Sequence, residues 1–400
     1  METREVKLGN IATVKGGKRL PKGTSLITTP NNHPYIRVRD LNGRRTLELD
    51  SSFEFVDDET QKTISRYIVN AGDIVLSIVG TIGLVAIVGK SLDKANLTEN
   101  CVKLASLTGI DRDYLYYFLK SSFGQQEIAR GTVGAVQAKL PIKNIQDITI
   151  PLPDEFTQRK IAAILDSMDE KIETNQKIND NLQQQAELLY HKRFETVNRD
   201  KLPVGWRIVR LGDVATISKK SFNPAKEPEM MLEHYSIPAF DEAHFPVFEP
   251  STAIKSNKFI VDDSCFMISK LNPTTKRVWK PYCLTANAVC STEFIVYKTK
   301  SQDLTDFLYS VIDSTSFSDF MCSHVTGSTG SRQRTTPSDT LAFELVLPNA
   351  EEIAEYQGVV SPMFEQIKCN AIENDRLKRL RDSLLPKLMS GELDVSSIQL

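Results

Sequence analysis

The sequence carries one pattern twice, about 200 residues apart. Leu8-Gly-Asn-Ile-Ala12 returns as Leu211-Gly-Asp-Val-Ala215, and Ile150-Pro-Leu-Pro153 returns as Leu345-Val-Leu-Pro348. This period is far longer than the roughly 20 to 50 residues of solenoid repeats. It therefore predicts two copies of one globular domain, each long enough to bury a core of its own.

A heptad pattern follows each copy. Between Ile161 and Leu189 the seam positions recur at alternating steps of four and three, and the same steps recur between Tyr356 and Leu384, 195 positions later. Such spacing over four heptads is typical of a coiled-coil seam. We expect two long helices that pack against each other, the first with a seam of roughly 42 Å at about 1.5 Å per residue.

Two seam positions in each helix hold asparagine, namely Asn175 and Asn179 in the first and Asn370 and Asn374 in the second. A buried seam asparagine costs stability but fixes the register and the partner of a helix. If the helices run antiparallel, the two pairs can meet and satisfy each other's amides. The alternative is that these side chains lie at exposed points of an imperfect seam.

The expected fold class is α+β, with four parts and a pseudo-twofold internal repeat. Two similar mixed α/β domains, residues 1–153 and 198–348, are separated by two helical segments, residues 154–197 and 349–400, which form an antiparallel coiled coil. Each domain combines short strands with one longer helix. The predicted elements are the helices 114–130 and 304–322 and the strands 35–38, 73–78, 84–88, 145–152, 265–269, 293–297 and 341–347.

Charge is distributed unevenly along a chain whose formal net charge is only −2. Residues 1–153 carry a net charge of +4, residues 196–348 carry none, and the segments 154–195 and 349–400 carry −3 each. Because the phosphates of nucleic acids attract cations, the two helices are poor candidates to lie along DNA. The basic side chains that could bind it lie in the globular copies.

No group of residues in the sequence predicts catalysis, a cofactor or a metal. The nearest approach to an amino-methyltransferase motif, Asn272-Pro-Thr-Thr275, lacks the second proline and the aromatic ring of that motif. The five histidines are scattered, and none has a partner four residues away that suits a metal. We therefore expect a chain that is not an enzyme.

The cysteines and the hydrophobic stretches point to a cytoplasmic chain. The six cysteines have neither zinc nor disulfide spacing, so we expect buried thiols in a reducing compartment. The uncharged stretch from Ile74 to Gly89 has 16 residues, fewer than the roughly 20 of a membrane span. The charged N-terminus is not followed by a signal peptide.

Basic clusters in predicted turns, with polar and aromatic neighbours, are the candidates for DNA binding. Arginine and lysine contact phosphates or guanine, and glutamine reads adenine. A solvated surface is the alternative explanation for any one cluster. The candidates are Lys15, Lys18, Arg19, Arg37, Arg39, Arg44, Thr81, Gln137 and Lys139 in the first copy, and Lys219, Lys220, Tyr235, Lys276, Arg277, Trp279, Lys280, Arg332, Gln333 and Arg334 in the second.

Two of these clusters occupy matching places in the two copies. The loops that start at Gly131 and Gly327 share their glycines, one glutamine and a following proline, but differ in the residues between. A common frame with different side chains would let the two copies recognise different bases. In the first copy Arg37 and Arg39 alternate along a predicted strand, so we expect both to project from one side.

In their order and duplication, these motifs resemble the specificity subunit of a type I restriction-modification system. The resemblance covers essentially the whole chain, and each motif is weak by itself. The motifs are the repeated 8–12 and 211–215, Leu202-Pro-Val-Gly-Trp206, Gly72-Asp-Ile-Val-Leu-Ser77 with Gly80-Thr-Ile-Gly83, Ile150-Pro-Leu-Pro153 with Gln158, and the segment 384–393.

The resemblance implies two target recognition domains that each read one half of a split, asymmetric sequence of double-stranded DNA. The helices would set the gap between the half-sites and dock two modification subunits, which carry the methyltransferase chemistry. A restriction subunit with motor and nuclease activity would join for cleavage. Self-association of the isolated subunit stays open.

Two other function classes compete with this interpretation. A self-sufficient DNA methyltransferase or nuclease would need a cofactor or metal site. A coiled-coil adaptor that binds only proteins would show no DNA specificity.

Overall fold

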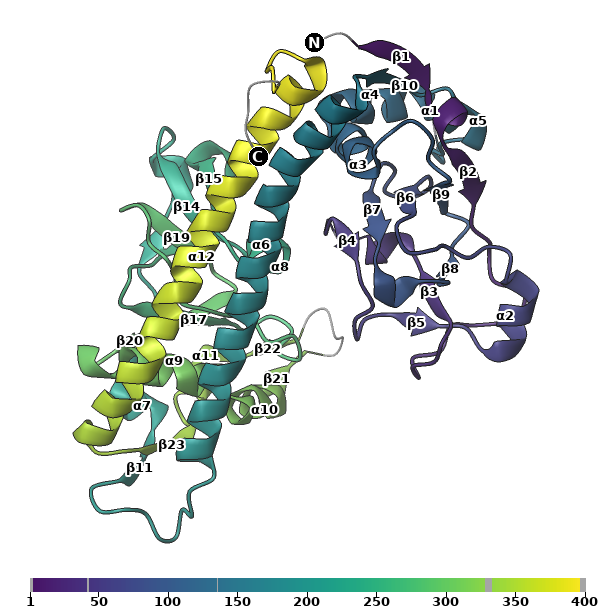
Figure 1. The fold of residues 1–400 in the computed structure, drawn as a ribbon. Helices are drawn as coiled ribbons and strands as arrows, with labels where there is room; N and C mark the ends of the chain where they lie inside the picture. Colours follow the sequence, from purple (N-terminus) through teal and green to yellow (C-terminus); the bar gives the residue numbers. More distant parts are fainter. Residues whose placement is uncertain (1–2, 42, 135, 328–332, 396–400) are drawn as a thin grey trace. The chain divides into compact units, whose positions relative to one another are not determined.

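A computed structural model describes residues 3–41, 43–134, 136–327 and 333–395 (Figure 1). The chain divides into two compact units. Unit 1 comprises Met1–Ile172 and Arg376–Leu400, and unit 2 comprises Glu173–Asp375. Each unit therefore holds one globular domain and a part of both long helices, α6 (Glu155–Tyr190) and α12 (Ala350–Ser390).

A five-stranded sheet in the order β2-β9-β6-β7-β4 forms the centre of unit 1. Its pairs are antiparallel except for β4 with β7, which is parallel. A three-stranded sheet (β5-β3-β8) and a ribbon (β1-β10) accompany it. The elements are β1 (Arg4–Lys7), α1 (Leu8–Ile11), β2 (Thr13–Gly16), β3 (Pro34–Ile36), η1 (Val38–Asp40), β4 (Thr46–Leu47), β5 (Glu54–Phe55), α2 (Asp58–Ile64), β6 (Ile74–Ser77), β7 (Val85–Val88), η2 (Lys90–Leu92), β8 (Asn96–Leu97), β9 (Cys101–Ala105), α3 (Arg112–Lys120), α4 (Ser122–Gly131), α5 (Ile142–Gln146) and β10 (Thr149–Leu152).

The domain of unit 2 repeats the centre of this plan. Its four-stranded sheet, β12-β20-β17-β18, corresponds to β2-β9-β6-β7. The domain also has a five-stranded sheet, β13-β16-β19-β14-β15. The elements are η3 (His191–Glu195), β11 (Arg207–Arg210), α7 (Leu211–Val214), β12 (Ala215–Ser218), β13 (Ser221–Phe222), η4 (Pro224–Lys226), β14 (Met231–Tyr235), α8 (Ile237–Ala243), β15 (Val247–Pro250), η5 (Ser251–Ala253), β16 (Lys258–Ile260), β17 (Cys265–Ser269), β18 (Val278–Trp279), β19 (Ala288–Ser291), β20 (Phe294–Thr299), η6 (Gln302–Leu304), α9 (Thr305–Asp313), α10 (Thr315–Ser323), β21 (Val325–Thr326), β22 (Arg334–Thr335), α11 (Pro337–Thr340) and β23 (Glu344–Leu347). The α+β class and the internal repeat are thereby confirmed.

The long helices complete the core of each unit. In unit 1 the fully buried Ile74 of β6 and Leu115 of α3 belong to one apolar cluster with Ile161 of α6 and Leu388 of α12. Unit 2 has the equivalent cluster, in which Tyr190 and Tyr356 come from the helices. Because burial of one such side chain stabilises by about 1.5–3 kcal/mol, each domain is fastened to both helices by its own core.

The predicted single helix of each domain is two helices in the structure. Ser121 ends α3 and caps α4, and its hydroxyl accepts the amide of Gly124. Ser314 does the same between α9 and α10 for the amide of Phe317. Both serines have extended backbone angles, which break the helix, and the hydroxyl satisfies an amide that the next helix would leave unpaired.

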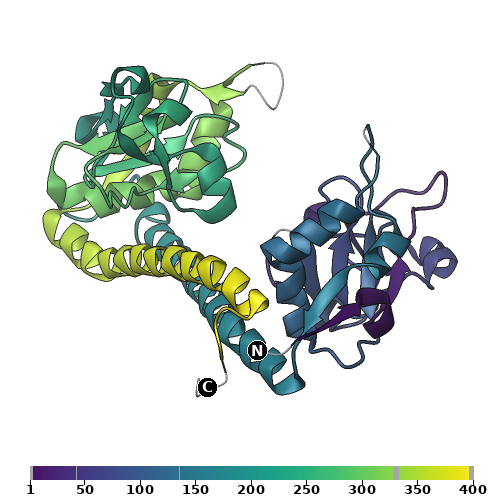
Figure 2. The same cartoon turned by 90° about the horizontal axis from the view of Figure 1, so that it is seen from above.

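The two long helices run antiparallel, and the asparagine pairs meet. Asn175 Nδ2 donates to Asn374 Oδ1 at 2.9 Å, and Asn370 Nδ2 donates to Asn179 Oδ1 at 2.8 Å. As one position number rises by four, the other falls by four, which only an antiparallel pair allows. Within each unit the segments of α6 and α12 lie side by side (Figure 1, Figure 2). The antiparallel coiled coil is thus confirmed.

The predicted seam holds except at its end. Leu189 is 39% exposed, whereas its neighbour Tyr190 is buried. The buried positions continue as Ala186, Tyr190 and Phe194, in steps of four, and a π-helical turn follows α6 at His191–Glu195. The π-helical turn is wider than an α-helical one. The rings of Tyr190 and Phe194 pack both on Tyr356 of α12 and on Phe307 of the second domain.

No helix in the described ranges has the length and apolar character that crossing a bilayer demands.

Candidate nucleic-acid interface

Four segments of unit 1 are tied together by backbone hydrogen bonds. The amide of Lys18 donates to Leu97 O at 2.8 Å, that of Ile78 to Asn100 O at 2.8 Å, and that of Leu140 to Ile78 O at 2.9 Å. These bonds place residues 17–19, 78–83, 97–101, 133–134 and 136–139 next to one another. We call this set edge 1. It contains Lys18, Arg19, Thr81, Gln137 and Lys139 of the predicted candidates.

A groove of about 360 Å³ opens at edge 1. Three of the predicted arginines, Arg19, Arg37 and Arg39, line it together. The side chain of Arg19 is 81% exposed and that of Arg39 is 59% exposed, so both can reach an anionic ligand. The remaining lining residues are Leu20, Leu26, Tyr35, Val38, Thr98, Glu99 and Asn100.

Acidic partners hold the arginines of this groove. Arg37 pairs with Glu54 and Asp40, yet its Nε and Nη2 atoms have no hydrogen-bond partner among the described residues. Burial raises the pKa of Asp40 to about 6, and the nearby Arg39 opposes that rise. A groove with a preformed ion network and two buried Arg37 nitrogens without hydrogen-bond partners is suited to accept a further oxygen ligand.

The expectation that Arg37 and Arg39 alternate along a strand is wrong. Strand β3 ends at Ile36, and a 3-10 turn over Val38–Asp40 follows because Asp40 accepts the amide of Arg37. The two arginines still converge, since both guanidinium groups contact Glu54.

A turn and a hairpin form the exposed part of edge 1. Val133 and Lys139 exchange backbone hydrogen bonds at 2.9 Å, which closes the hairpin. The hydroxyl of Ser77 donates to the carbonyl of Thr81 at 2.6 Å and holds the turn. Thr81, Gln137 and Lys139 are all exposed, so they are available to a large ligand.

Unit 2 has the same frame. The amide of Asn272 donates to Gln333 O at 2.9 Å, and the amide of Thr335 donates to Lys270 O at 3.1 Å, as Leu140 does to Ile78 in unit 1. Residues 270–275, 325–327 and 333–335 form edge 2. The segment Asn272–Thr275 therefore takes the place of the turn Gly80–Gly83, although its sequence differs.

Edge 2 carries fewer of the predicted candidates in described positions. Gln333 is half-buried, and Arg334 pairs with Glu293 at 3.0 Å. Arg332 lies outside the described residues.

Three further basic candidates of unit 2 form ion pairs with acidic residues of the same unit. Lys276 contacts Asp313 and Glu187 of α6, which ties the domain to the helix. Arg277 binds Asp241 through two hydrogen bonds, and Lys280 pairs with Asp306.

Both aromatic candidates of unit 2 lie in its core. Tyr235 is fully buried, and its hydroxyl accepts the amides of Tyr282 and Cys283. Trp279 is 1% exposed. Neither side chain can reach a ligand on the surface.

The remaining candidates are exposed but stand away from the groove lining. Arg44 lies 3.8 Å from Asp50. Lys15 faces Lys103 across the pair of β2 and β9. Lys219 and Lys220 are exposed after β12. A solvated surface explains each of these side chains as well as a ligand would.

Sequence reasoning missed the polar residues of the groove. Thr98, Glu99 and Asn100 lie between β8 and β9 and face the arginines. Nothing in a short polar turn indicates which distant residues it meets. The one sequence feature that could have indicated this part of the groove was Glu99, an acidic residue in a turn that follows a buried strand.

Comparison with known proteins indicates which function the backbone arrangement of edges 1 and 2 serves in similar chains. Residues 1–184 match the family model described as type I restriction modification DNA specificity domain. The specificity subunit of the type I restriction enzyme MjaIX of Methanocaldococcus jannaschii is 25% identical over 395 residues, with 91% of this chain and 88% of that protein covered. The chain is therefore similar to type I restriction specificity subunits over most of its length.

Two further comparisons point the same way. The specificity subunit of the type I restriction enzyme HindI of Haemophilus influenzae is 24% identical, with 64% of this chain and 71% of that protein covered. The crystal structure of the S subunit of a type I restriction-modification system from M. genitalium has a TM-score of 0.59 at 17% identity. It covers 97% of this chain and 96% of that chain, so the fold is shared from end to end.

The described part of the chain offers no cluster of three or more histidine, cysteine or acidic side chains that could bind a metal. Its six cysteines are free, and three of them are buried.

A buried acid in unit 2 predicts a pH-dependent stability. Burial raises the pKa of Asp313 to about 6, and Lys276 opposes the rise. Because the folded state holds this proton more tightly than the unfolded chain does, stability should fall as pH rises from about 4 through 6 and then level off. The free energy of unfolding of unit 2 should lose about 3 kcal/mol over that range from this group.

Replacing Asp313 by asparagine should remove this contribution to the slope. Urea unfolding followed by tryptophan fluorescence reports unit 2, since Trp206 and Trp279 both lie there. The matched control is Asp319→Asn, which removes the same charge from an exposed site of the adjoining helix α10. Equal pH slopes for the two variants would contradict the assignment.

Proposed function

We propose that this chain is a type I restriction specificity subunit that reads a bipartite sequence of double-stranded DNA, with edge 1 on one half-site and edge 2 on the other. The observation that carries the proposal is the shared frame of the two edges. The same backbone bonds present Gln137 and Lys139 in unit 1 and Gln333 and Arg334 in unit 2. A common backbone frame with different side chains would let two domains of the same fold recognise the two different halves of an asymmetric target.

The charge of the groove supports edge 1 as a DNA contact. Arg19 and Arg39 are exposed there, and Arg37 offers a donor without a partner. Arginine forms paired hydrogen bonds to guanine and to phosphate. Thr98 and Asn100 add hydroxyl and amide groups to the same groove, so its lining combines phosphate-binding cations with groups that can read base edges.

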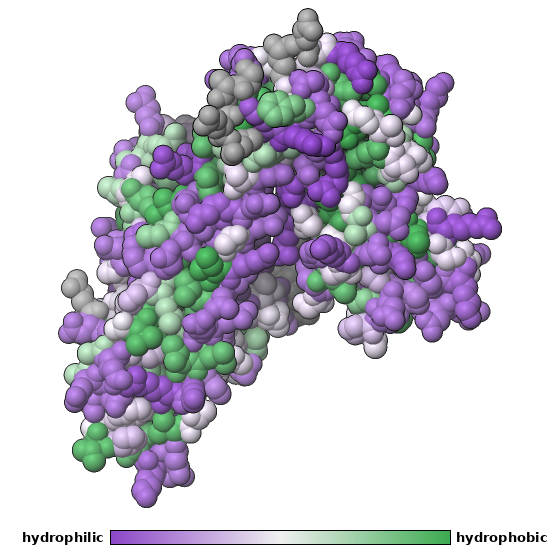
Figure 3. Space-filling model, in the orientation of Figure 1, coloured by the Kyte–Doolittle hydropathy of each residue, from purple (hydrophilic) through white to green (hydrophobic). Residues whose placement is uncertain are grey.

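We assign the chemistry to partner subunits. The two helices would set the gap between the half-sites and dock two modification subunits, and a restriction subunit would join for cleavage. Apolar side chains such as Ile178, Leu188, Val359 and Leu380 are exposed along the helices. Hydrophobic residues are visible among hydrophilic ones on the helix surface in Figure 3. Exposed apolar side chains on an otherwise acidic helix pair suit protein partners better than DNA. The seam asparagines would keep the register of the helix pair.

The test is a selection from random duplex DNA with the full chain assembled with its modification subunits. We expect two short enriched motifs at a fixed separation, and binding that weakens steeply as salt rises. A pool without enriched motifs, despite stable assembly with the partners, would overturn the proposal and favour a protein-binding adaptor.

A further inference from the structure

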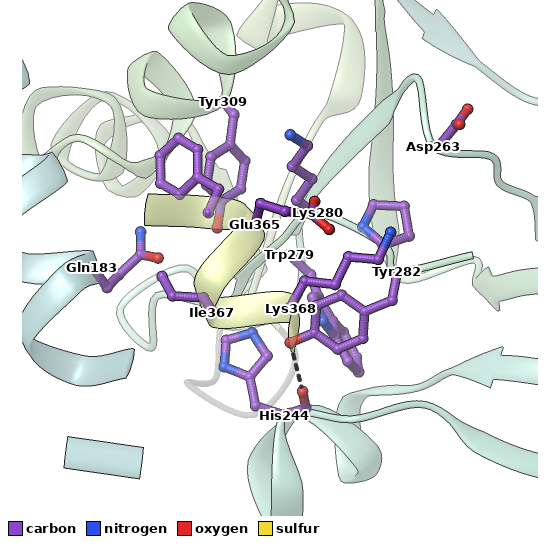
Figure 4. A pocket seen from close by; sticks show the side chains of 12 residues that line it. Gln183, His244, Asp263, Trp279, Lys280, Tyr282, Tyr309, Glu365, Ile367 and Lys368 are labelled. Atoms are coloured by element: carbon purple, nitrogen blue, oxygen red, sulfur yellow. Dashed lines mark hydrogen bonds between the residues drawn. The ribbon is translucent and has the colours of Figure 1, made fainter. Parts of the chain in front are cut away.

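Unit 2 holds a cavity that no step of DNA reading uses. It has a volume of about 220 Å³ and lies between the globular domain and both long helices (Figure 4). Gln183 comes from α6, and Ile367 from α12, whereas His244 and Tyr282 come from the domain. The other lining residues are Asp263, Trp279, Lys280, Pro281, Tyr309, Phe364, Glu365 and Lys368.

The size of this cavity points to a two-ring ligand. An engineered apolar cavity of about 150 Å³ holds benzene. A cavity of about 220 Å³ therefore has room for a fused bicyclic ring system. The rings of Trp279, Tyr282, Tyr309, Phe364 and His244 supply aromatic walls, and aromatic walls favour flat ligands that present a π-face or a ring edge.

The polar groups favour a ligand with donors and acceptors on its rim and no negative charge. The lining has two cations, Lys280 and Lys368, and two carboxylates, Glu365 and Asp263. Lys280 is already paired with Asp306, so the two lining carboxylates outnumber the remaining cation and the site does not favour an anionic ligand.

One buried donor in the wall lacks a partner. The indole Nε1 of the 1% exposed Trp279 makes no hydrogen bond within the described residues. The nearby Tyr282 hydroxyl interacts with this indole and slightly offsets the burial that raises the pKa of Tyr282, but it donates its own proton to His244 O at 3.2 Å. A buried indole N–H usually finds an acceptor. This nitrogen has no accessible surface, so a bound ring would contact the ring of Trp279 and pair its polar rim with other lining groups such as Gln183.

The wall also carries backbone strain. His244, which ends α8, has a φ value of 50°, in the left-handed region that residues other than glycine seldom adopt. The strained backbone of His244 sets its ring 4.2 Å from Phe240 and 5.3 Å from Trp279, measured between ring centroids. Such strain persists where the surrounding structure holds a side chain in a required place.

We propose that this cavity is a binding site for a purine-type heteroaromatic ring. A purine has the size of two fused rings, a π-face for the aromatic walls, and both acceptors and donors on its rim. It would come either from a free nucleoside or from an unpaired base of a nucleic acid. Because the walls belong to the domain and to both helices, a bound ring would fasten the second domain to the coiled coil.

The test uses Trp279 as the reporter. The chain has two tryptophans, so Trp206→Phe leaves Trp279 alone, and the new phenylalanine can keep the contact with Phe194. Adenosine titrated into this full-length variant should quench the fluorescence, with a dissociation constant between about 10 µM and 1 mM for a ligand of this size.

Two variants locate the site. His244→Ala should weaken adenosine binding at least about fivefold, whereas His324→Ala should not change it. The control is matched, because His324 stacks on Phe320 at 4.1 Å, as His244 does on Phe240, but does not line the cavity. Ile367→Phe, which fills the cavity from α12, should abolish binding. If that variant fails to fold, the comparison of the two histidines still decides.

Oligonucleotides separate the two sources of the ring. Quenching by adenosine identifies a free nucleoside as a ligand. Quenching by a single-stranded oligodeoxyadenylate, with none by an abasic strand of equal length and none by adenosine, identifies a nucleic-acid base. No quenching by any of these probes at millimolar concentration, or quenching that both histidine variants leave unchanged, would overturn the proposal. None of these outcomes depends on half-site reading.

Discussion

Replacing Asp169 by alanine is expected to destabilise unit 1 by about 3 kcal/mol or more. Asp169 lies in α6, is 7% exposed, and binds Arg381 of α12 at 2.5 Å. The Tyr117 hydroxyl of the first domain lies 2.8 Å from the same carboxylate. Removal of one partner of a buried ion pair leaves the other charge uncompensated, which typically costs about 3–5 kcal/mol.

The matched control is Asp382→Ala. Asp382 binds the same guanidinium at 2.8 Å, but its side chain is 64% exposed, so its loss should cost less than about 1 kcal/mol. Hydrogen exchange of the amides of α3 would measure both effects within unit 1. The tryptophan-monitored transition of unit 2 should not move. If the two variants destabilise unit 1 equally, the contribution of the Asp169–Arg381 pair to stability does not come from its burial.

The second large effect concerns DNA. Replacing Gln137 and Lys139 by alanine should weaken binding of the selected bipartite target by roughly 10- to 100-fold and relax the sequence preference at one half-site only. The corresponding change of Gln333 and Arg334 should relax the other half-site. Each pair of substitutions should also lower the salt dependence of binding by about one phosphate contact for each cation removed.

Repeating the random-sequence selection with each variant would show which half-site has changed. Lys143→Ala is the control, because it removes an exposed cation from α5, next to the first hairpin but outside edge 1. Equal loss of preference at both half-sites would contradict separate readers, even if overall binding fell.

Periodicity made the frame of the molecule predictable. The heptads and their asparagines identified two helices, their antiparallel direction and the partner of each amide. This was possible because the buried positions of a coiled-coil seam recur at regular steps of three and four residues. Short-range signals were less decisive. The predicted strand 145–152 is in fact α5 followed by β10, since the segment after Pro141 turns into a helix before the strand begins.

The roles of single basic residues could not be read in advance. Lys276 resembles a DNA contact in the sequence, but it neutralises Asp313 and Glu187, which lie 37 and 89 residues away. Trp279 resembles a stacking side chain but is enclosed by Tyr235, Phe240 and Phe294. Whether a cation faces solvent or a distant acid depends on the tertiary fold, and local sequence does not record it.

The discontinuous make-up of unit 1 has a consequence for its biosynthesis. Leu385, Leu388 and Met389 belong to the same apolar cluster as Leu8 and Ile161, yet the ribosome adds them more than 200 residues after Ile172. At a translation rate of about 5–20 residues per second, roughly 10 to 40 s pass between the synthesis of the first domain and that of these side chains. A nascent chain of this architecture has to shield an unfinished apolar surface while its second domain is still being translated.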